Sequence, residues 1–202
     1  MQETPATVFL VDDDEPVRQA IGLLLKSAGL ACEAFAGADE FLDAYDPDRP
    51  GCLVADMRMP GTSGLDLQAR LREMGHEIPV IIITGHGDVP AAVRALKQGA
   101  VDFIEKPFNE QALLDAINQA VTTDRDNRNA REARRRCREL LDTLTDRERE
   151  VMQLVVEGRP NKIIADQLAL SIKTVEFHRG NVMTKLQVES VADLVKLVLE
   201  AN

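Results

Sequence analysis

The sequence predicts an α/β domain with a doubly wound, five-stranded parallel sheet, followed by a small all-α domain of four helices. Apolar segments typical of buried strands alternate with amphipathic helices throughout the first 121 residues. Such alternation favours a parallel sheet with right-handed crossovers. Strand signals then stop, and a polar, arginine-rich segment precedes four short helical patterns. The strands are expected near residues 7–11, 31–35, 51–56, 79–84 and 101–105.

Apolar residues at helical spacing predict four helices in the same region. In a doubly wound sheet such helices cover both faces, and ligands bind outside the carboxyl ends of the strands. The residues that mark one face of each helix are Val17, Ile21, Leu24, Leu25 and Ala28; then Leu65, Leu67 and Leu71; then Val89, Val93 and Leu96 with Lys97; and finally Leu113, Leu114, Ile117 and Val121.

Charge is distributed unevenly along the chain. Residues 1–121 carry 9 basic and 20 acidic groups, residues 122–144 carry 7 and 5, and residues 145–202 carry 8 and 9. An acidic front half joined through an arginine-rich segment to a nearly neutral back half favours two domains with different roles. We expect a first domain at 1–121, a helical linker at 122–143 and an all-α domain at 144–202.

The linker has a pattern that two structures could explain. Residues 124–139 contain no Pro or Gly and are mostly good helix formers. Some of its apolar residues alternate at spacings of three and four, as in a coiled-coil seam. Because two of the five are alanine, a solvated connecting helix and a dimer contact both remain open. The five residues are Ala130, Ala133, Cys137, Leu140 and Leu144.

Cysteine usage and hydropathy place limits on the compartment. Cys32, Cys52 and Cys137 lack metal-ligand spacing, and their odd number argues against a disulfide framework. No apolar run approaches the ~18 residues of a membrane span, and the N-terminus lacks the pattern of a secretory leader. We therefore expect a cytoplasmic protein that does not bind a membrane.

Capping residues divide the last domain into four short helices. Gly158 is expected to end the first of them, and the third is expected to run to about residue 186. The predicted caps are, in chain order, a capping box of Thr145 and Glu148, then Asn161, Ser171 and Ser190. The last helix is expected to turn four residues inward, namely Val191, Leu194, Leu197 and Val198.

Carboxylates follow two of the predicted strands at the point where each strand ends. Asp12 and Asp13 follow the first strand, and Asp56 ends the third. Because the carboxyl ends of parallel strands share one edge, these acids should converge there with Thr84 and Lys106. Two unit charges 4 Å apart repel by ~4 kcal/mol at an effective dielectric near 20. The pocket therefore needs a cation, and an all-oxygen site with room for water suits Mg²⁺.

Asp56 is the candidate nucleophile of this pocket. A carboxylate can accept a phosphoryl group and form an acyl phosphate. Lys106 is placed to pair with that phosphate, although it could equally serve as counter-ion to the acids. Thr84 can donate its hydroxyl to a phosphate oxygen. His86, between two glycines, is expected in a loop beside Thr84 rather than in a catalytic role.

Residues 161–186 fit a helix, a short turn and a second helix, as in a helix-turn-helix. On the second helix, Val175 and Val182 share one face, whereas Phe177 and Gly180 point the opposite way. An exposed Phe could meet a thymine methyl, and a small residue suits a helix that enters a groove. The net charge of −1 is not that of a typical nucleic-acid binder. Periodicity alone leaves DNA binding and a plain helical bundle both open.

The residues of the acidic pocket lie in sequence motifs that resemble those of the receiver domain of two-component response regulators. This resemblance covers roughly residues 1–121. The motifs are Val8 to Asp13, Asp56-Met57-Arg58-Met59-Pro60-Gly61, Thr84-Gly85-His86-Gly87-Asp88 and Lys106-Pro107-Phe108. The segments that begin at Thr84 and end at Phe108 are similar to the FixJ subgroup in particular. This resemblance implies a flavodoxin-like fold and a sensor histidine kinase as phosphoryl donor.

The same resemblance implies a role for each pocket residue. Asp56 would be the phospho-acceptor, and Lys106 would contact the phosphate. Thr84 would move toward the phosphoryl group, and Phe103 would swing inward to fill the vacated space. The implied Mg²⁺ ligands are Asp12, Asp13, Asp56 and the backbone carbonyl of Arg58.

The last 63 residues, about 140–202, resemble LuxR-type DNA-binding domains. The strings that carry this likeness begin at Leu144, at Gly158 and at Ser171. The resemblance implies that the helix from residue 172 lies in the major groove of DNA. Some relatives have a lysine where this chain has Gly180. The implied DNA contacts are Lys162, Lys173 and Arg179 to phosphates, and Thr174, Glu176, Phe177 and Asn181 on the recognition helix.

Together these resemblances predict a phosphorylation-controlled transcription factor and not an enzyme. Phosphorylation of Asp56 would favour a homodimer through the face that includes Val93 and Lys97, and the dimer would bind promoter DNA. RNA polymerase is a further expected partner. Two alternatives from other classes are a hydrolase that forms an aspartyl phosphate and a phospho-controlled module that binds protein or RNA.

Overall fold

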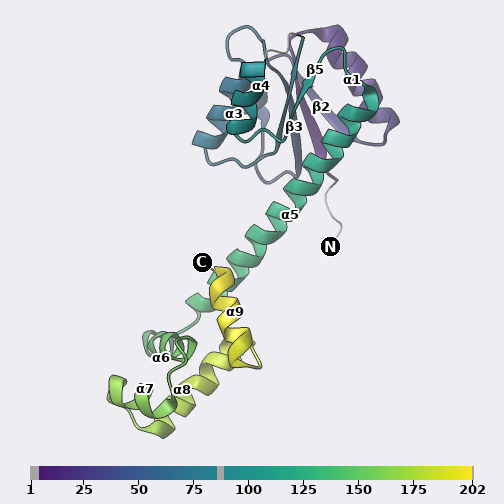
Figure 1. Cartoon of the computed structure of the whole chain (residues 1–202). Coiled ribbons are helices and arrows are strands. Elements are labelled where there is room, and N and C mark those ends of the chain that lie inside the picture. Colours follow the sequence, from purple (N-terminus) through teal and green to yellow (C-terminus); the bar gives the residue numbers. More distant parts are fainter. Residues whose placement is uncertain (1–4, 86–88, 202) are drawn as a thin grey trace. The chain divides into compact units, whose positions relative to one another are not determined.

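The computed structural model describes residues 5–85 and 89–201. Contacts divide the chain into two units, Met1–Asn127 and Arg128–Asn202. The first unit contains five strands: β1 (Thr7–Val11), β2 (Ala31–Phe35), β3 (Gly51–Asp56), β4 (Val80–Thr84) and β5 (Asp102–Glu105). They pair in parallel in the order β2-β1-β3-β4-β5 (Figure 1). This order is the flavodoxin-like one, and the predicted fold class is confirmed.

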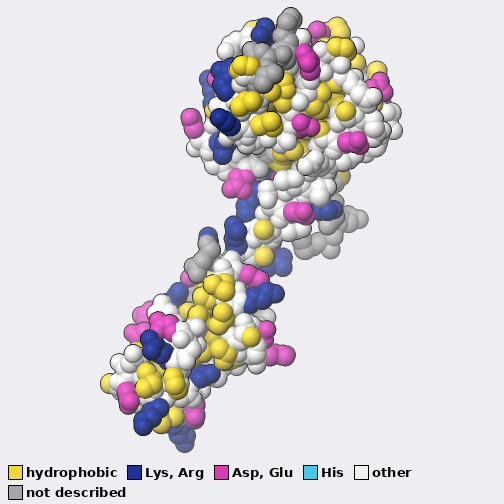
Figure 2. Space-filling model, in the orientation of Figure 1, with side chains coloured by type: hydrophobic (Ala, Val, Ile, Leu, Met, Phe, Trp, Pro, Cys, Tyr) yellow, Lys and Arg dark blue, Asp and Glu magenta, His cyan; other side chains and the backbone are white. Residues whose placement is uncertain are grey.

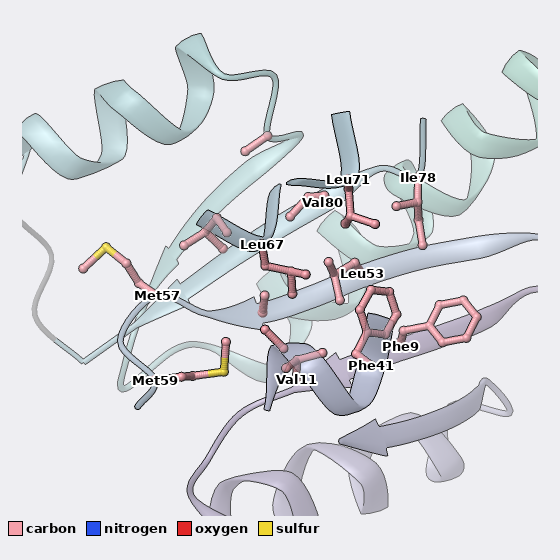
Figure 3. Packing of buried hydrophobic residues seen from close by; sticks show 14 of the residues in the cluster. Phe9, Val11, Phe41, Leu53, Met57, Met59, Leu67, Leu71, Ile78 and Val80 are labelled. Carbon is pink, nitrogen blue, oxygen red and sulfur yellow. The ribbon is translucent and has the colours of Figure 1, made fainter. Parts of the chain in front are cut away.

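Two layers of helices cover the sheet. The helices of the first unit are α1 (Glu15–Ser27), α2 (Ala38–Ala44), α3 (Gly64–Glu73), α4 (Val89–Lys97) and the first part of α5 (Glu110–Asp142). On one face, Val8 and Val54 pack with Ile21 of α1 and Leu113 of α5. On the other face, α2, α3 and α4 cover a second cluster of buried residues, part of which is shown in Figure 3. Successive strand residues therefore alternate between two cores, as parallel strands buried on both faces require.

The apolar spacing did not predict helix α2. It is seven residues long, and only Ala38 and Phe41 are buried. Phe41 nevertheless packs edge-on against the ring of Phe9, with centroids 5.7 Å apart, and Figure 3 shows both rings within the same cluster. A helix of fewer than two full turns offers too few repeats for its periodicity to stand out.

Helix α5 is longer than any helix expected from the sequence. It runs without a break from Glu110 to Asp142, so the predicted last receiver helix and the predicted linker form one helix. Of the five residues spaced as a coiled-coil seam, Cys137 and Leu144 are buried in the core of the second unit. Leu140 is partly buried there, whereas Ala130 and Ala133 are exposed. The last three of these residues therefore pack within the second unit.

The second unit contains the end of α5 and four further helices, as predicted. These are α6 (Asp146–Val156), α7 (Asn161–Leu168), α8 (Ile172–Lys185) and α9 (Val191–Ala201). Apolar residues from every helix meet in one core, including Val151, Ile164, Val175, Val182 and Leu194. No helix in the described part of the chain is both long enough and apolar enough to cross a membrane.

Most predicted caps of this unit are confirmed, and two details are wrong. Thr145 and Glu148 form a full capping box, while Ser171 and Ser190 accept from backbone amides of the first turn of α8 and α9. Asn161 is not a cap: α7 begins at Asn161 itself, and its side chain accepts a hydrogen bond from Arg179 instead. Val191 does not point inward, because 38% of it is exposed.

Candidate functional site

Four neighbouring strands bring polar side chains to one edge of the sheet. Asp12 follows β1, Asp56 ends β3, Thr84 ends β4, and Lys106 follows β5. The register pairs Asp56 with Ile83 and Thr84 with Glu105, so the strand ends lie side by side. Asp12, Asp56 and Thr84 are all buried, with exposed fractions of 1%, 6% and 0%.

Lys106 joins the two buried carboxylates. Its Nζ atom lies 2.7 Å from Oδ2 of Asp12 and 2.6 Å from Oδ1 of Asp56. Burial works against the charged ammonium, but the hydrogen bonds to Asp12 and Asp56 outweigh it, so the pKa of Lys106 is raised. Desolvated carboxylates would otherwise repel each other strongly. The single ammonium therefore stabilises two acids at once.

The second oxygen of each buried acid accepts a backbone hydrogen bond. Oδ1 of Asp12 accepts from the amide of Asp14 at 2.9 Å, and Oδ2 of Asp56 accepts from the amide of Arg58 at 2.6 Å. These bonds fix the orientation of both carboxylates. The carboxylate of Asp56, the candidate phospho-acceptor, therefore also holds the backbone turn that follows it.

Asp13 is placed differently from the other two acids. It is exposed, and within residues 5–85 and 89–201 no three His, Cys, Asp or Glu side chains are close enough to hold a metal ion. The residue types still fit Mg²⁺, because two carboxylates and the carbonyls of the loop that follows are the hard oxygen donors this ion takes. His86 lies outside the described residues.

Two further residues border the pocket. The carbonyl of Thr84 accepts from the amide of Lys106 at 2.7 Å, so β4 holds the backbone of the lysine. Phe103 of β5 is partly buried against the core beneath α4. No pattern of residues singles out Gly64, yet a Cβ there would lie 2.4 Å from the carbonyl oxygen of Asp56. Only glycine lets α3 begin so close to the end of β3.

Helix α4 carries an exposed apolar strip near this edge. Val93 is 44% exposed and Leu96 is 50% exposed, and Lys97 beside them is also exposed. Isolated exposed apolar residues are common, but two on neighbouring turns of one helix form a continuous strip. The predicted dimer residues Val93 and Lys97 are therefore accessible on the described chain.

Helix α8 of the second unit separates a buried face from an exposed one. Val175 and Val182 are buried, whereas Lys173, Glu176 and Phe177 are exposed, Phe177 by 64%. Figure 2 shows basic and acidic side chains intermixed on the visible face of this unit. The structure places the remaining predicted contacts as follows: Lys162 is exposed, and Thr174, Arg179 and Asn181 are half-buried.

Hydrogen bonds orient α8 at two points along its length. Arg179 donates to the side chain of Asn161 at the start of α7. At its other end, Lys185 donates to Glu148, the residue that also completes the capping box of α6. The hydrogen bond from Lys185, together with that from the Thr145 amide, lowers the pKa of Glu148 to about 2. Both helices next to α8 are therefore fixed to it by polar contacts as well as by the core.

Comparison with known proteins gives the family. Residues 8–118 match the family described as the response regulator receiver domain, and residues 142–198 match the bacterial regulatory proteins of the luxR family. The transcriptional regulatory protein FixJ of Rhizobium meliloti is 47% identical over 201 residues, which cover 97% of this chain and 96% of that protein. Nodulation protein W of Bradyrhizobium diazoefficiens is 46% identical and covers 96% of this chain and 86% of its own length.

Solved structures agree with this assignment. The response regulator StyR superposes with a TM-score of 0.88 at 48% identity, over 97% of this chain and 99% of that one. Full-length FixJ from B. japonicum gives a TM-score of 0.60 at 39% identity, with 98% of each chain covered. Such relatives are transcriptional regulators rather than hydrolases, so the enzyme alternative loses its support. The chain belongs to the response regulators that join a receiver domain to a LuxR-type DNA-binding domain and regulate transcription.

Proposed function

We propose that a sensor histidine kinase phosphorylates Asp56 and that this modification controls promoter binding by the second unit. The observation that carries the proposal is the position of Asp56, whose carboxylate ends β3 within 2.6 Å of Lys106. The family implies a histidine kinase partner and DNA binding. A promoter-binding regulator of this family would act in the cytoplasm.

The proposed step is transfer of a phosphoryl group from a phosphohistidine to Asp56. A carboxylate oxygen forms a bond to phosphorus as the bond from phosphorus to the histidine nitrogen breaks, which leaves an acyl phosphate and a free imidazole. Asp12, Asp13, Asp56 and the Arg58 carbonyl would hold Mg²⁺, which supplies positive charge opposite the phosphoryl oxygens. Lys106 would exchange its contact with the Asp56 carboxylate for one with the phosphate.

The response to phosphorylation is proposed to involve Thr84 and Phe103. The buried hydroxyl of Thr84 would turn toward the phosphoryl group, and Phe103 would swing inward to fill the space that Thr84 vacates. The exposed strip of Val93 and Leu96, with Lys97, would then form the contact between two receiver domains. A homodimer presents two copies of α8, which suits two DNA half-sites about one helical turn apart. Recruitment of RNA polymerase is part of the same proposal.

The DNA contacts are proposed on the exposed face of α8 and on α7. Lys162, Lys173 and Arg179 would contact phosphates, which position the domain without reading sequence. Thr174, Glu176, Phe177 and Asn181 would lie nearest to the base edges. The 64% exposure of Phe177 supports this reading, since a large apolar side chain gains by leaving water.

The acceptor assignment is tested by Asp56→Asn in the full chain. We expect the variant to take no phosphoryl group from a small acyl phosphate or from the kinase, whereas Asp43→Asn, an exposed acid on α2, is labelled as the wild type is. Labelling of Asp56→Asn would overturn the assignment.

A second experiment selects bound duplexes from a random pool, with and without acyl phosphate. It would test phospho-control, half-site spacing and DNA binding together.

The recognition face is tested by Glu176→Ala in the same selection. We expect altered sequence preference at one base position in each half-site, with unchanged affinity for non-specific duplex. An unchanged preference would show that Glu176 does not face the bases.

A further inference from the structure

Helix α5 carries a buried acid at the end of the sheet opposite to the phosphorylation pocket. Its buried face in the first unit consists of Leu113, Ala116, Ile117, Ala120 and then Asp124, at regular helical spacing. An apolar residue is expected at the last of these positions, yet Asp124 is only 1% exposed. Along α5, every residue of which is described, no further residue is fully buried until Cys137. Asp124 is thus the last point at which the first unit encloses this helix.

Asp124 is held by a directional contact with β3. Its Oδ2 atom accepts a hydrogen bond from the backbone amide of Gly51 at 2.9 Å, across 73 residues of sequence. Gly51 has a φ of +156°, and a Cβ at this position would lie 1.9 Å from the carbonyl oxygen of Thr7. The amide that meets Asp124 therefore belongs to a backbone position that only glycine can occupy.

The surrounding contacts join neighbouring strands at this end of the sheet. Arg49 pairs with Glu33 of β2 at 2.5 Å and lies 5.2 Å above the ring centroid of Phe9. The amide of Thr7 donates to the carbonyl of Pro50 at 2.9 Å. Strands β1, β2 and β3 are thereby tied together where Asp124 reaches them. Burial raises the pKa of Cys52 to about 12, and the nearby charge of Asp124 adds to this effect.

We propose that Asp124 is a positioning residue for the phosphorylation response, which sets the rotation and axial register of α5 where it leaves the receiver domain. This inference rests on the proposed function. Apolar contacts are non-directional and tolerate sliding, whereas a hydrogen bond to one amide fixes a helix both along and around its axis. The same helix begins four residues after Lys106 and ends within the core of the second unit. It is the covalent path from the pocket to the DNA-binding domain.

The test compares Asp124→Leu, Asp124→Asn and Asp126→Leu in the full chain. Leucine branches at Cγ as aspartate does and suits the buried face, but it is bulkier and cannot accept a hydrogen bond from the Gly51 amide. Asparagine has the shape of aspartate and keeps an acceptor oxygen. Asp126 is exposed on the same helix and serves as the matched control. For each chain we would measure the rate of phosphorylation by acyl phosphate, the affinity for selected duplex in both states, and hydrogen exchange of the Gly51 amide.

For Asp124→Leu we expect fast exchange at Gly51, an unchanged phosphorylation rate, and a ratio of phosphorylated to unphosphorylated DNA affinity that falls at least about fivefold. Asp124→Asn and Asp126→Leu should keep the wild-type ratio. A wild-type ratio in Asp124→Leu, with the Gly51 amide deprotected, would overturn the inference. If Asp124→Leu does not fold, Asp124→Ser replaces it in the test. The side chain of serine is too short to reach the Gly51 amide, so we expect the same loss of the affinity ratio. If phosphorylation leaves the DNA affinity of the wild-type chain unchanged, the proposed function is refuted instead.

Discussion

Lys185 and Glu148 form an ion pair that joins the end of α8 to the start of α6, with 2.6 Å between Nζ and Oε2. The side chain of Glu148 is only 5% exposed, and it also accepts a hydrogen bond from the backbone amide of Thr145 in the capping box. One carboxylate thus completes a helix start and orients the recognition helix. Because a buried ion is costly without its partners, the pair should be visible in stability measurements.

The first prediction concerns the pH dependence of the second unit. The folded pKa of Glu148 is about 2, against an ordinary value of 4.5, so its contribution to stability is complete above pH 4.5 and is lost as pH falls toward 2. Glu148→Gln should lower the free energy of unfolding of this unit by about 1–3 kcal/mol at pH 7 and by much less near pH 2. Urea unfolding followed by amide signals of α6 and α8 measures both values. Glu150→Gln, which removes an exposed partner of Arg147, should cost less than about 1 kcal/mol.

The second prediction concerns the cation in the acidic pocket. Lys106→Met leaves two buried carboxylates without their ammonium, which should cost about 3–5 kcal/mol of receiver stability in the absence of divalent ions. Added Mg²⁺ should then raise the thermal midpoint of the variant more than that of the wild type. Lys97→Met, at an exposed position on α4, provides the control and should respond as the wild type does. Equal responses of all three chains would contradict a cation site at these acids.

The third prediction separates a phosphate contact from a positioning contact. Lys173 is exposed, so Lys173→Ala should reduce the slope of log affinity against log salt by about one. Arg179 is half-buried and donates to Asn161, and Asn161→Ala should weaken binding without changing that slope. Binding isotherms for one duplex at several salt concentrations distinguish these effects. Because Arg179 is proposed to reach a phosphate as well, Arg179→Ala should lower the slope as Lys173→Ala does; an unchanged slope would limit its role to the contact with Asn161.

The fourth prediction compares two glycines in helices of the receiver domain. A Cβ at Gly64 would lie 2.4 Å from the Asp56 carbonyl oxygen, so Gly64→Ala should displace the end of β3 and slow phosphorylation. Gly22, within α1, has nothing within 4 Å of its added Cβ. Gly22→Ala should therefore raise stability by up to about 1 kcal/mol and leave phosphorylation unchanged. Labelling rates and thermal midpoints of the two variants provide the check.

The fold and the buried acids could be predicted because their signals are local. Apart from β2, each strand is a short, largely apolar run that ends in a polar residue or is directly followed by one, and a parallel sheet must place these ends on one edge. Asp12, Asp56, Thr84 and Lys106 follow directly from that rule. The same rule grouped Asp13 with them; Asp13 lies in the bend that follows β1 and is exposed, and its role at Mg²⁺ stays a prediction.

Other features depend on contacts between distant residues and could not be read from spacing. Asp124 interrupts an apolar face, and the amide that donates to it belongs to Gly51, 73 residues away in the sequence. Asn161 is a good cap by residue type, but Arg179 engages its side chain and α7 begins one residue earlier than that role requires. The Thr145–Glu148 box could be predicted because both partners lie within one turn.

The charge balance at Lys106 has a consequence for which donors can reach Asp56. One ammonium faces two buried carboxylates, and Asp13 adds a further negative charge from the surface. A small acyl phosphate, itself an anion, must approach against this field, and dissolved ions screen that repulsion. A protein donor that docks on the receiver domain offsets it through contacts made elsewhere. Without a bound cation the pocket therefore favours a docked protein donor over a small anionic one, and Mg²⁺ at these acids would reduce that difference.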